Sequence, residues 1–193
     1  MIGLLQYAAI ERHGDHVKCL DKLIKMGIPC YGNQDVCDNH KGCNLLPKVL
    51  QLDGFKIQNF ELVHDVPNNA FVIDTNDGIR ILYCTDTQYI PKIVKNVHYA
   101  IIECNNDEDV IIDNAVNGIY SRSHYENHQS LNNCIEYLKR IYNPNLQGII
   151  LWHLSETNIN EDVAINRIKE ELCFSNVYVA KKGLELELEK EEF

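Results

Sequence analysis

Three side chains able to bind a metal ion stand within four positions near the start of the chain. They are His13, Asp15 and His16, in the segment Glu11-Arg12-His13-Gly14-Asp15-His16. Imidazole nitrogens and carboxylate oxygens are common ligands of zinc and related divalent cations. The segment follows the apolar run Leu4–Ile10, which predicts a strand. The sequence therefore indicates half of a metal site at the point where a strand ends.

Three more ligand-type residues stand where other apolar strand patterns end. His64 follows Phe60-Glu61-Leu62-Val63, Asp86 follows Ile81-Leu82-Tyr83-Cys84, and His153 follows Ile149-Ile150-Leu151-Trp152. Strand ends are rigid, whereas the loops beyond them can be shaped around a substrate. We therefore expect His64, Asp86 and His153 to complete the metal site.

The elements that must position these residues alternate between strand and helix patterns. Apolar residues at helical spacing predict helices over Val17–Met26, Ser130–Tyr142 and Asn160–Leu172. The predicted strands are Leu4–Ile10, Ile28–Tyr31, Phe55–Val63, Ala70–Asp74, Ile79–Thr85, Tyr99–Cys104, Gly148–Leu154, Val177–Ala180 and Leu184–Leu188. Asn76-Asp77-Gly78 predicts a hairpin turn, and the polar segment Asn33–Asn44 a long loop. The mixture indicates an α/β sandwich with helices covering sheet faces.

Composition limits the classes of protein that fit. At 193 residues and 45% hydrophobic content, the chain fits one domain spanning 1–193, with an acidic tail at about 185–193. The net charge of −10 argues against nonspecific affinity for nucleic acid or an anionic membrane. It does not exclude a nuclease, because two bound divalent cations restore positive potential where a phosphate must sit.

The cysteines indicate a reducing compartment. There are eight, but a chain this long and apolar needs no disulfide scaffold. No signal peptide precedes the first motif, and no apolar run approaches the roughly 20 residues of a membrane span. We therefore expect a cytoplasmic protein with no membrane partner. Cys37, His40 and Cys43 could form part of a zinc knuckle with Cys30, although a polar loop often holds such residues by accident.

Taken together, the candidate ligands resemble the metallo-β-lactamase-fold hydrolases. The first metal motif of that superfamily is His-x-His-x-Asp-His, followed by a lone His, a bridging Asp and a last His. The flanking segments are similar to one branch, the bacterial and phage exonuclease-like members. The matching segments are Thr85-Asp86-Thr87, Glu103-Cys104-Asn105-Asn106-Asp107 and His153-Leu154-Ser155. The resemblance runs from about residue 5 to about residue 180 and implies an αββα sandwich.

The resemblance also implies two divalent metal ions, zinc or manganese, with magnesium as a further option. His13 and His64 would bind the first ion, Asp15, His16 and His153 the second, and Asp86 would bridge them. A hydroxide between the ions would be the nucleophile, because paired cations lower the pKa of bound water. Asp15 has a second implied role, which is to orient that hydroxide.

Histidines near the start of the second predicted helix, Ser130–Tyr142, add a further candidate. His128-Gln129-Ser130 resembles the His-x-Ser segment of the same branch, and His124 lies just before it. A histidine at such a helix start could hold a phosphate oxygen or protonate a leaving group. Equally, Ser130 or Asn127 caps the helix and His128 is only exposed.

Two departures from the family pattern leave alternatives open. Glu11 stands where the first motif has a histidine. If Glu11 binds the metal, its carboxylate favours harder ions such as Mn²⁺ or Mg²⁺. If Glu11 does not bind, the site has lost one ligand and the metal pair is weakened. Family members also carry several strands before this motif, so we expect an N-terminally shortened fold with an exposed edge and an apolar face. Another subunit, a contracted fold or a longer gene would each account for the difference.

The leading hypothesis is a metal-dependent hydrolase that acts on a phosphodiester or a nucleic-acid end. Acyl or thioester hydrolysis on the same scaffold is the alternative reaction. The rival class is a catalytically impaired protein that acts as a binding or oligomerising module, for instance as a homodimer through its uncovered sheet. Glu11 and the missing strands favour the rival class.

Overall fold

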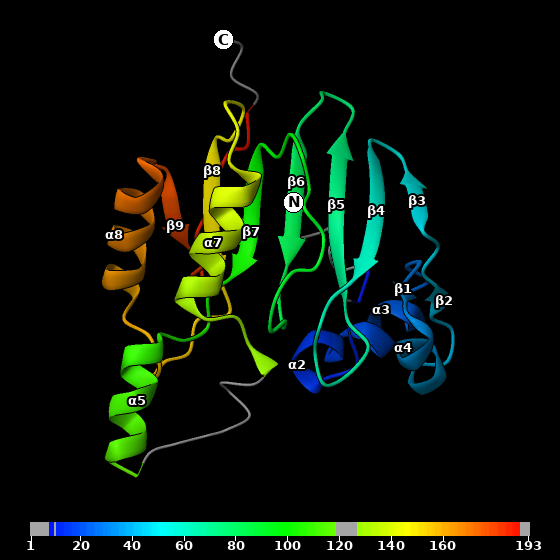
Figure 1. Ribbon diagram of the computed structural model, residues 1–193. Helices are drawn as coiled ribbons and strands as arrows, with labels where there is room; N and C mark the ends of the chain where they lie inside the picture. The colour runs from blue at the N-terminus through cyan, green and yellow to red at the C-terminus, as the bar shows by residue number, and fades with distance from the viewer. Residues whose placement is uncertain (1–7, 10, 119–126, 190–193) are drawn as a thin grey trace.

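A seven-stranded sheet forms the centre of the protein in this computed structural model, which describes residues 8–9, 11–118 and 127–189. In spatial order the strands are β3 (Val49–Leu52), β4 (Phe55–Glu61), β5 (Asn69–Thr75), β6 (Arg80–Cys84), β7 (Tyr99–Glu103), β8 (Gly148–Trp152) and β9 (Val177–Val179). Strands β3 to β6 pair antiparallel, whereas β6 to β9 pair parallel. The carboxyl ends of β6, β7 and β8 therefore meet at one edge, at the lower end of the sheet in Figure 1.

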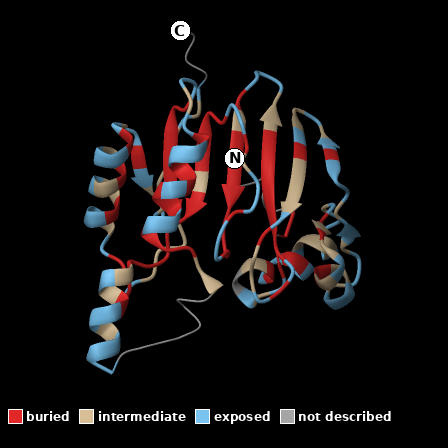
Figure 2. Ribbon diagram, viewed as in Figure 1, coloured by how far each residue is buried: buried red, intermediate tan, exposed pale blue. Residues whose placement is uncertain are grey.

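Two amphipathic helices cover one face of the sheet. Helix α7 (Leu131–Ile141) lies over β7 and β8, and α8 (Glu161–Leu172) lies beside β9 (Figure 1). Each helix begins where a side-chain oxygen, of Ser130 or of Asn160, accepts a hydrogen bond from a backbone N–H three residues later. Their buried stripes join the alternate residues of the central strands in the larger core of the protein. The central strands are coloured mostly as buried in Figure 2.

The opposite face of the sheet is also apolar and buried. Phe71 and Ile73 point to it from β5, while Val72, between them, belongs to the first core. Leu46, Leu186 and several other half-buried side chains pack against this second core. The exposed apolar face expected from the sequence does not occur among the described residues, because Phe71 is 0% and Ile73 1% exposed.

Smaller elements gather below the lower ends of β4 and β5 in Figure 1. They are α2 (Gly14–Val17), α3 (Leu20–Lys25), β1 (Tyr31–Gly32), α4 (Gln34–Asn39) and β2 (Asn44–Leu45). Helix α5 (Glu108–Val116) follows β7 in the chain and lies at the lower left in Figure 1. Strands β1 and β2 pair parallel as a separate two-stranded sheet. No helix in the described ranges is long and apolar enough to cross a membrane.

Several sequence-based expectations are corrected by these elements. The expected loop Asn33–Asn44 contains α4, which is capped by Asn33 and buries one side chain, Val36, in a small third core. The expected strand Leu184–Leu188 forms no strand; its leucines are half-buried and its glutamates exposed, so only the alternation was right. The expected helix Val17–Met26 is interrupted between α2 and α3. The strand expected at Leu4–Ile10 falls mainly outside the described residues, although Ala8 bridges to Tyr31.

Candidate metal centre

The candidate ligands converge at the lower edge of the sheet. His64 comes from the loop after β4, Asp86 from the loop after β6, and His153 directly after β8. Glu11 and His13 precede α2, and His16 lies within it. Six of the predicted metal ligands therefore meet at one place; the side chain of the seventh, Asp15, lies outside the described part of the structure, as does His124.

Glu11, His13 and His64 form the first of three groups whose ligand atoms lie close enough to share a cation. Glu11 Oε2 lies 3.0 Å from His13 Nδ1 and 3.5 Å from His64 Nε2. His64 is held by its other nitrogen, Nδ1, which lies 3.0 Å from the carbonyl oxygen of Asn127. That contact leaves Nε2 facing the group, as a metal-binding histidine requires.

Glu11, His16 and Asp86 form the second group. His16 Nε2 lies 2.8 Å from Asp86 Oδ2 and 3.6 Å from the second oxygen of Glu11, Oε1. The Glu11 carboxylate therefore belongs to two groups at once and directs one oxygen towards each.

Asp86, Glu103, His128 and His153 form the third group. His153 Nε2 lies 3.4 Å from Asp86 Oδ1, while its Nδ1 lies 3.1 Å from Glu103 Oε1. The same Glu103 oxygen lies 2.6 Å from His128 Nδ1, and the backbone N–H of Thr87 donates to Oε2 at 2.7 Å. Glu103 thus fixes the orientation of two histidine rings.

Backbone conformation marks two of these residues. Asp86 has φ 52° and His153 has φ 56°, so both adopt the left-handed region that non-glycine residues rarely occupy. Each stands just past the end of a buried parallel strand, where the neighbouring strands constrain the chain. Such conformations concentrate at functional sites, because the surrounding structure must over-determine them. Here they turn both side chains towards the shared edge.

The carboxylates of the site have different electrostatic environments. Burial raises the pKa of Glu11, although the positive charges of His13 and His16 oppose the shift. Burial acts in the same direction on Asp86, but a hydrogen bond from His16 and the nearby histidine charges outweigh it and lower the pKa of Asp86 to about 2. Of these two carboxylates, Glu11 is the one whose charge is less compensated by its described neighbours.

His128 has the environment of a proton donor. Burial alone would lower the pKa of its imidazole, but the hydrogen bond and the negative charge of Glu103 outweigh burial and raise that pKa above its ordinary value. Ser130 caps helix α7, as the second interpretation of this segment expected. His128 is nevertheless half-buried and contacts Glu103, so it lies at the candidate site and is not only exposed.

Glu103 is the functional candidate that sequence reasoning did not assign. It is fully buried at the end of the apolar strand β7. The rule that selected His64, Asp86 and His153, a ligand-type residue at the end of an apolar strand, also applies to Glu103. Three of the zinc-knuckle residues lie near one another, because burial and the thiols of Cys37 and Cys30 together raise the pKa of Cys43 to about 12. None of the three candidate groups among the described residues includes a cysteine, however, and His40 Nδ1 lies 2.9 Å from Asp21 Oδ1. All eight cysteines are free thiols.

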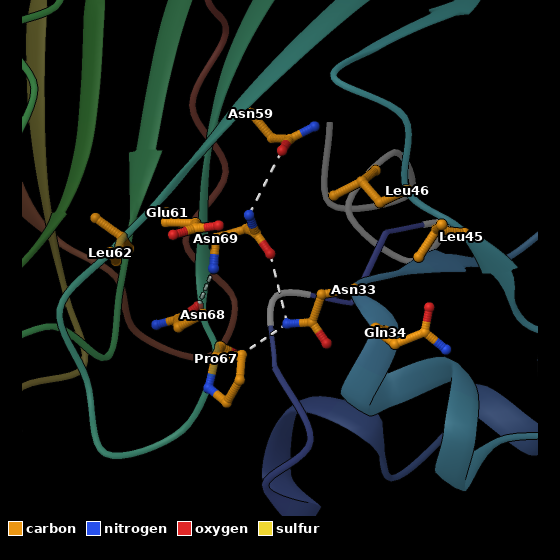
Figure 3. A pocket seen from close by; sticks show the side chains of 10 residues that line it. All are labelled: Asn33, Gln34, Leu45, Leu46, Asn59, Glu61, Leu62, Pro67, Asn68 and Asn69. Carbon is orange, nitrogen blue, oxygen red and sulfur yellow. Dashed lines mark hydrogen bonds between the residues drawn. The ribbon is translucent and has the colours of Figure 1, made fainter.

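A cavity of about 440 Å³ adjoins the loop that carries His64 (Figure 3). Its lining is rich in carboxamides and contains one carboxylate and no cationic side chain. The lining residues are Asn33, Gln34, Leu45, Leu46, Asn59, Glu61, Leu62, Pro67, Asn68 and Asn69. Asn68 connects the cavity to the candidate metal centre, because its amide donates to the carbonyl oxygens of Thr85 and Asp86 at 2.8 and 2.5 Å.

Comparison with known proteins identifies the fold. No family model matches the sequence, and no curated protein does. The metallo-β-lactamase fold protein YhfI from Bacillus subtilis superimposes with a TM-score of 0.70 at 19% identity, over 92% of this chain and 75% of that chain. A diphosphatase from the PhnP family gives 0.66 at 14% identity, over 95% and 72%. The short form of human tRNase Z gives 0.62 at 15% identity, over 94% and 78%.

These similarities show that the chain has the metallo-β-lactamase fold, as the motif order predicted. This chain covers 72 to 78% of the length of these three matched chains. At identities this low the comparisons show the fold alone, and the particular activity must be argued from the site.

Proposed function

We propose that this protein is a metal-dependent hydrolase whose substrate is a phosphodiester. The observation that carries the proposal is the cluster of three buried carboxylates and five histidines at one edge of the sheet. Glu11, Asp86 and Glu103 are each at most 3% exposed, and no Lys or Arg of the described residues forms an ion pair with any of them. Buried carboxylates in such number require cations nearby.

The residues present fit two divalent ions. Both oxygens of Glu11 are buried and accept no hydrogen bond among the described residues. We assign the metal ligands as Glu11, His13 and His64 on one side and His16, Asp86 and His153 on the other. By motif resemblance, Asp15 joins the second set and Asp86 also bridges to the first. Bound divalent ions would activate water and stabilise the negative charge that develops on a phosphodiester.

The other residues of the site would position and protonate the substrate. His128, held by Glu103, would donate a proton to the leaving oxygen, because its raised pKa favours the protonated form of the imidazole. The carboxamides of the adjoining cavity would bind an uncharged polar part of the substrate, such as a base. We infer phosphodiesters over other esters from the motif resemblance to exonuclease-like proteins and from the diphosphatase and tRNase Z among the structural neighbours.

Hydrolysis assays with the purified, metal-supplemented protein test this proposal. We expect Mn²⁺- or Mg²⁺-dependent cleavage of bis(p-nitrophenyl) phosphate and of single-stranded DNA or RNA ends, and its loss in Asp86→Asn and His153→Ala. The matched control Glu136→Gln changes an exposed carboxylate on α7, remote from the site, and should retain activity. Hydrolysis of small carboxylic esters or thioesters but not of phosphodiesters would overturn the substrate class.

A second candidate function is a non-catalytic binding or oligomerising module. It has less support, since the site is assembled from six separate segments and the second face of the sheet is buried within the described chain. Elemental analysis that finds no metal after supplemented purification, with a dimer in sedimentation experiments, would favour this second function.

A further inference from the structure

Glu11 is the residue at which this chain differs from the family motif, and its two oxygens face two different groups of ligands. Oε2 lies beside His13 and His64, and Oε1 lies beside His16. A histidine at this position would offer one ligand atom, and so could serve only one ion. The carboxylate offers two.

The distances around Glu11 are close to those between ligands of one metal ion. Ions bound at about 2.1 Å in tetrahedral or octahedral geometry hold adjacent ligand atoms about 3.0 to 3.4 Å apart. The nitrogens nearest to Glu11 lie at 3.0, 3.5 and 3.6 Å, two beside one oxygen and one beside the other. None of these three contacts has the geometry of a hydrogen bond to Glu11, so a cation on each side would satisfy the two oxygens.

The burial of Glu11 strengthens this argument. Its side chain is 0% exposed, and no described Lys or Arg forms an ion pair with it. A buried carboxylate with two unsatisfied oxygens is strongly destabilising unless both are paired. Asp86 differs, because Oδ2 already has His16 at 2.8 Å and Thr85 donates to the same carboxylate.

We propose that Glu11 is a bridging ligand, with Oε2 binding one divalent ion beside His13 and His64 and Oε1 binding a second beside His16 and Asp86. This inference rests on the proposed metal-dependent function. Together with Asp86, which the motif resemblance makes a bridge, it gives the centre two bridging carboxylates where the family motif supplies one. The additional oxygen ligand also favours Mn²⁺ or Mg²⁺ over Zn²⁺, because oxygen donors select harder ions.

Stepwise metal titration distinguishes a bridge from a terminal ligand. Mn²⁺ and Zn²⁺ are titrated into the metal-free protein by calorimetry, with bound metal counted by elemental mass spectrometry. Because Glu11 contributes to both ions, Glu11→Gln should weaken both binding steps by at least about tenfold. His64→Ala removes a ligand from one group only and should weaken one step. The exposed-site control Glu136→Gln should leave both steps unchanged.

A second variant tests metal preference and guards against misfolding. Glu11→His restores the family residue and should shift the ratio of Zn²⁺ to Mn²⁺ affinity at least about tenfold towards Zn²⁺. Folding is checked by thermal unfolding in EDTA, where Glu11→Gln should be at least as stable as the unaltered protein, since it removes a buried charge.

The outcomes separate this inference from the proposed function. If the unaltered protein binds two ions and hydrolyses phosphodiesters but Glu11→Gln weakens only one step, or neither, Glu11 is not a bridge and the function stands. If the unaltered protein binds no divalent ion at millimolar concentration, both proposals fail. An unchanged Zn²⁺ to Mn²⁺ ratio in Glu11→His also overturns the bridging role.

Discussion

Replacing Glu103 by Gln should weaken the protein even when no metal is bound. Glu103 Oε1 lies 2.6 Å from His128 Nδ1 and 3.1 Å from His153 Nδ1, while Oε2 accepts from the N–H of Thr87. Glutamine retains one oxygen for Thr87 and turns its NH₂ group towards both histidines. Two charge-assisted hydrogen bonds are lost, each contributing about 1.5 to 3 kcal/mol. Since one ring can change tautomer and accept from the amide, we expect a net loss of about 2 to 4 kcal/mol.

Urea unfolding in EDTA measures this loss. The chain has one tryptophan, Trp152, which precedes His153 directly and reports on the site by fluorescence. A loss of about 2 to 4 kcal/mol corresponds to a fall in Tm of roughly 4 to 16 °C for a chain of this length. The exposed-site variant Glu136→Gln should change stability by less than about 0.5 kcal/mol. A similarly small change for Glu103→Gln would refute the role of Glu103 in holding the two rings.

The remaining predictions concern helix α4, His128 and the core. Asn33→Ala should lower the free energy of unfolding in urea by about 2 kcal/mol, because Asn33 both caps α4 and donates a hydrogen bond to Pro67 O at 2.7 Å. The control Asn160→Ala removes only a helix cap and should lower it by about 1 kcal/mol. Equal losses in the two variants would exclude a contribution from the hydrogen bond to Pro67. Because the pKa of His128 is raised in the folded state, its stabilisation of the metal-free protein is complete below about pH 6.5 and is lost as the pH rises through the folded-state pKa. An NMR titration should show a lower His128 pKa in Glu103→Gln. An unchanged pKa would contradict the pairing of His128 with Glu103. Leu138→Ala, at a fully buried position of α7, should destabilise by about 2 to 5 kcal/mol, and a loss under 1 kcal/mol would contradict the packing of α7 on the sheet.

Local patterns predicted the elements whose determinants are close in sequence. The hairpin at Asp77-Gly78 is present between β5 and β6, with Gly78 at φ 85°, because the turn and the alternation on both sides agree. The buried stripes of α7 and α8 are long enough for helical spacing to be unambiguous. Helix α4 was missed because six residues around one buried side chain, Val36, carry too little periodicity.

The strand expected at Leu184–Leu188 shows the opposite failure. Alternating Leu and Glu determine which side chains are buried, and the structure follows that pattern. Whether such a segment becomes a strand depends on a neighbouring strand with free backbone groups, and no such partner pairs with it among the described residues. Alternation specifies a one-sided surface, not a hydrogen-bonded ladder.

By itself, the sequence determined which residue types could form the metal centre, and that most of them follow apolar strands. It did not determine which atoms face each other, since that depends on strand order, on the parallel register of β6, β7 and β8, and on the left-handed backbone at Asp86 and His153. Only the tertiary structure placed Glu103 between two histidines and turned the two oxygens of Glu11 towards different groups. The physical reason is that ligand geometry requires atoms within a few ångströms of one another, and residues more than 50 positions apart in sequence are brought that close only by long-range strand pairing.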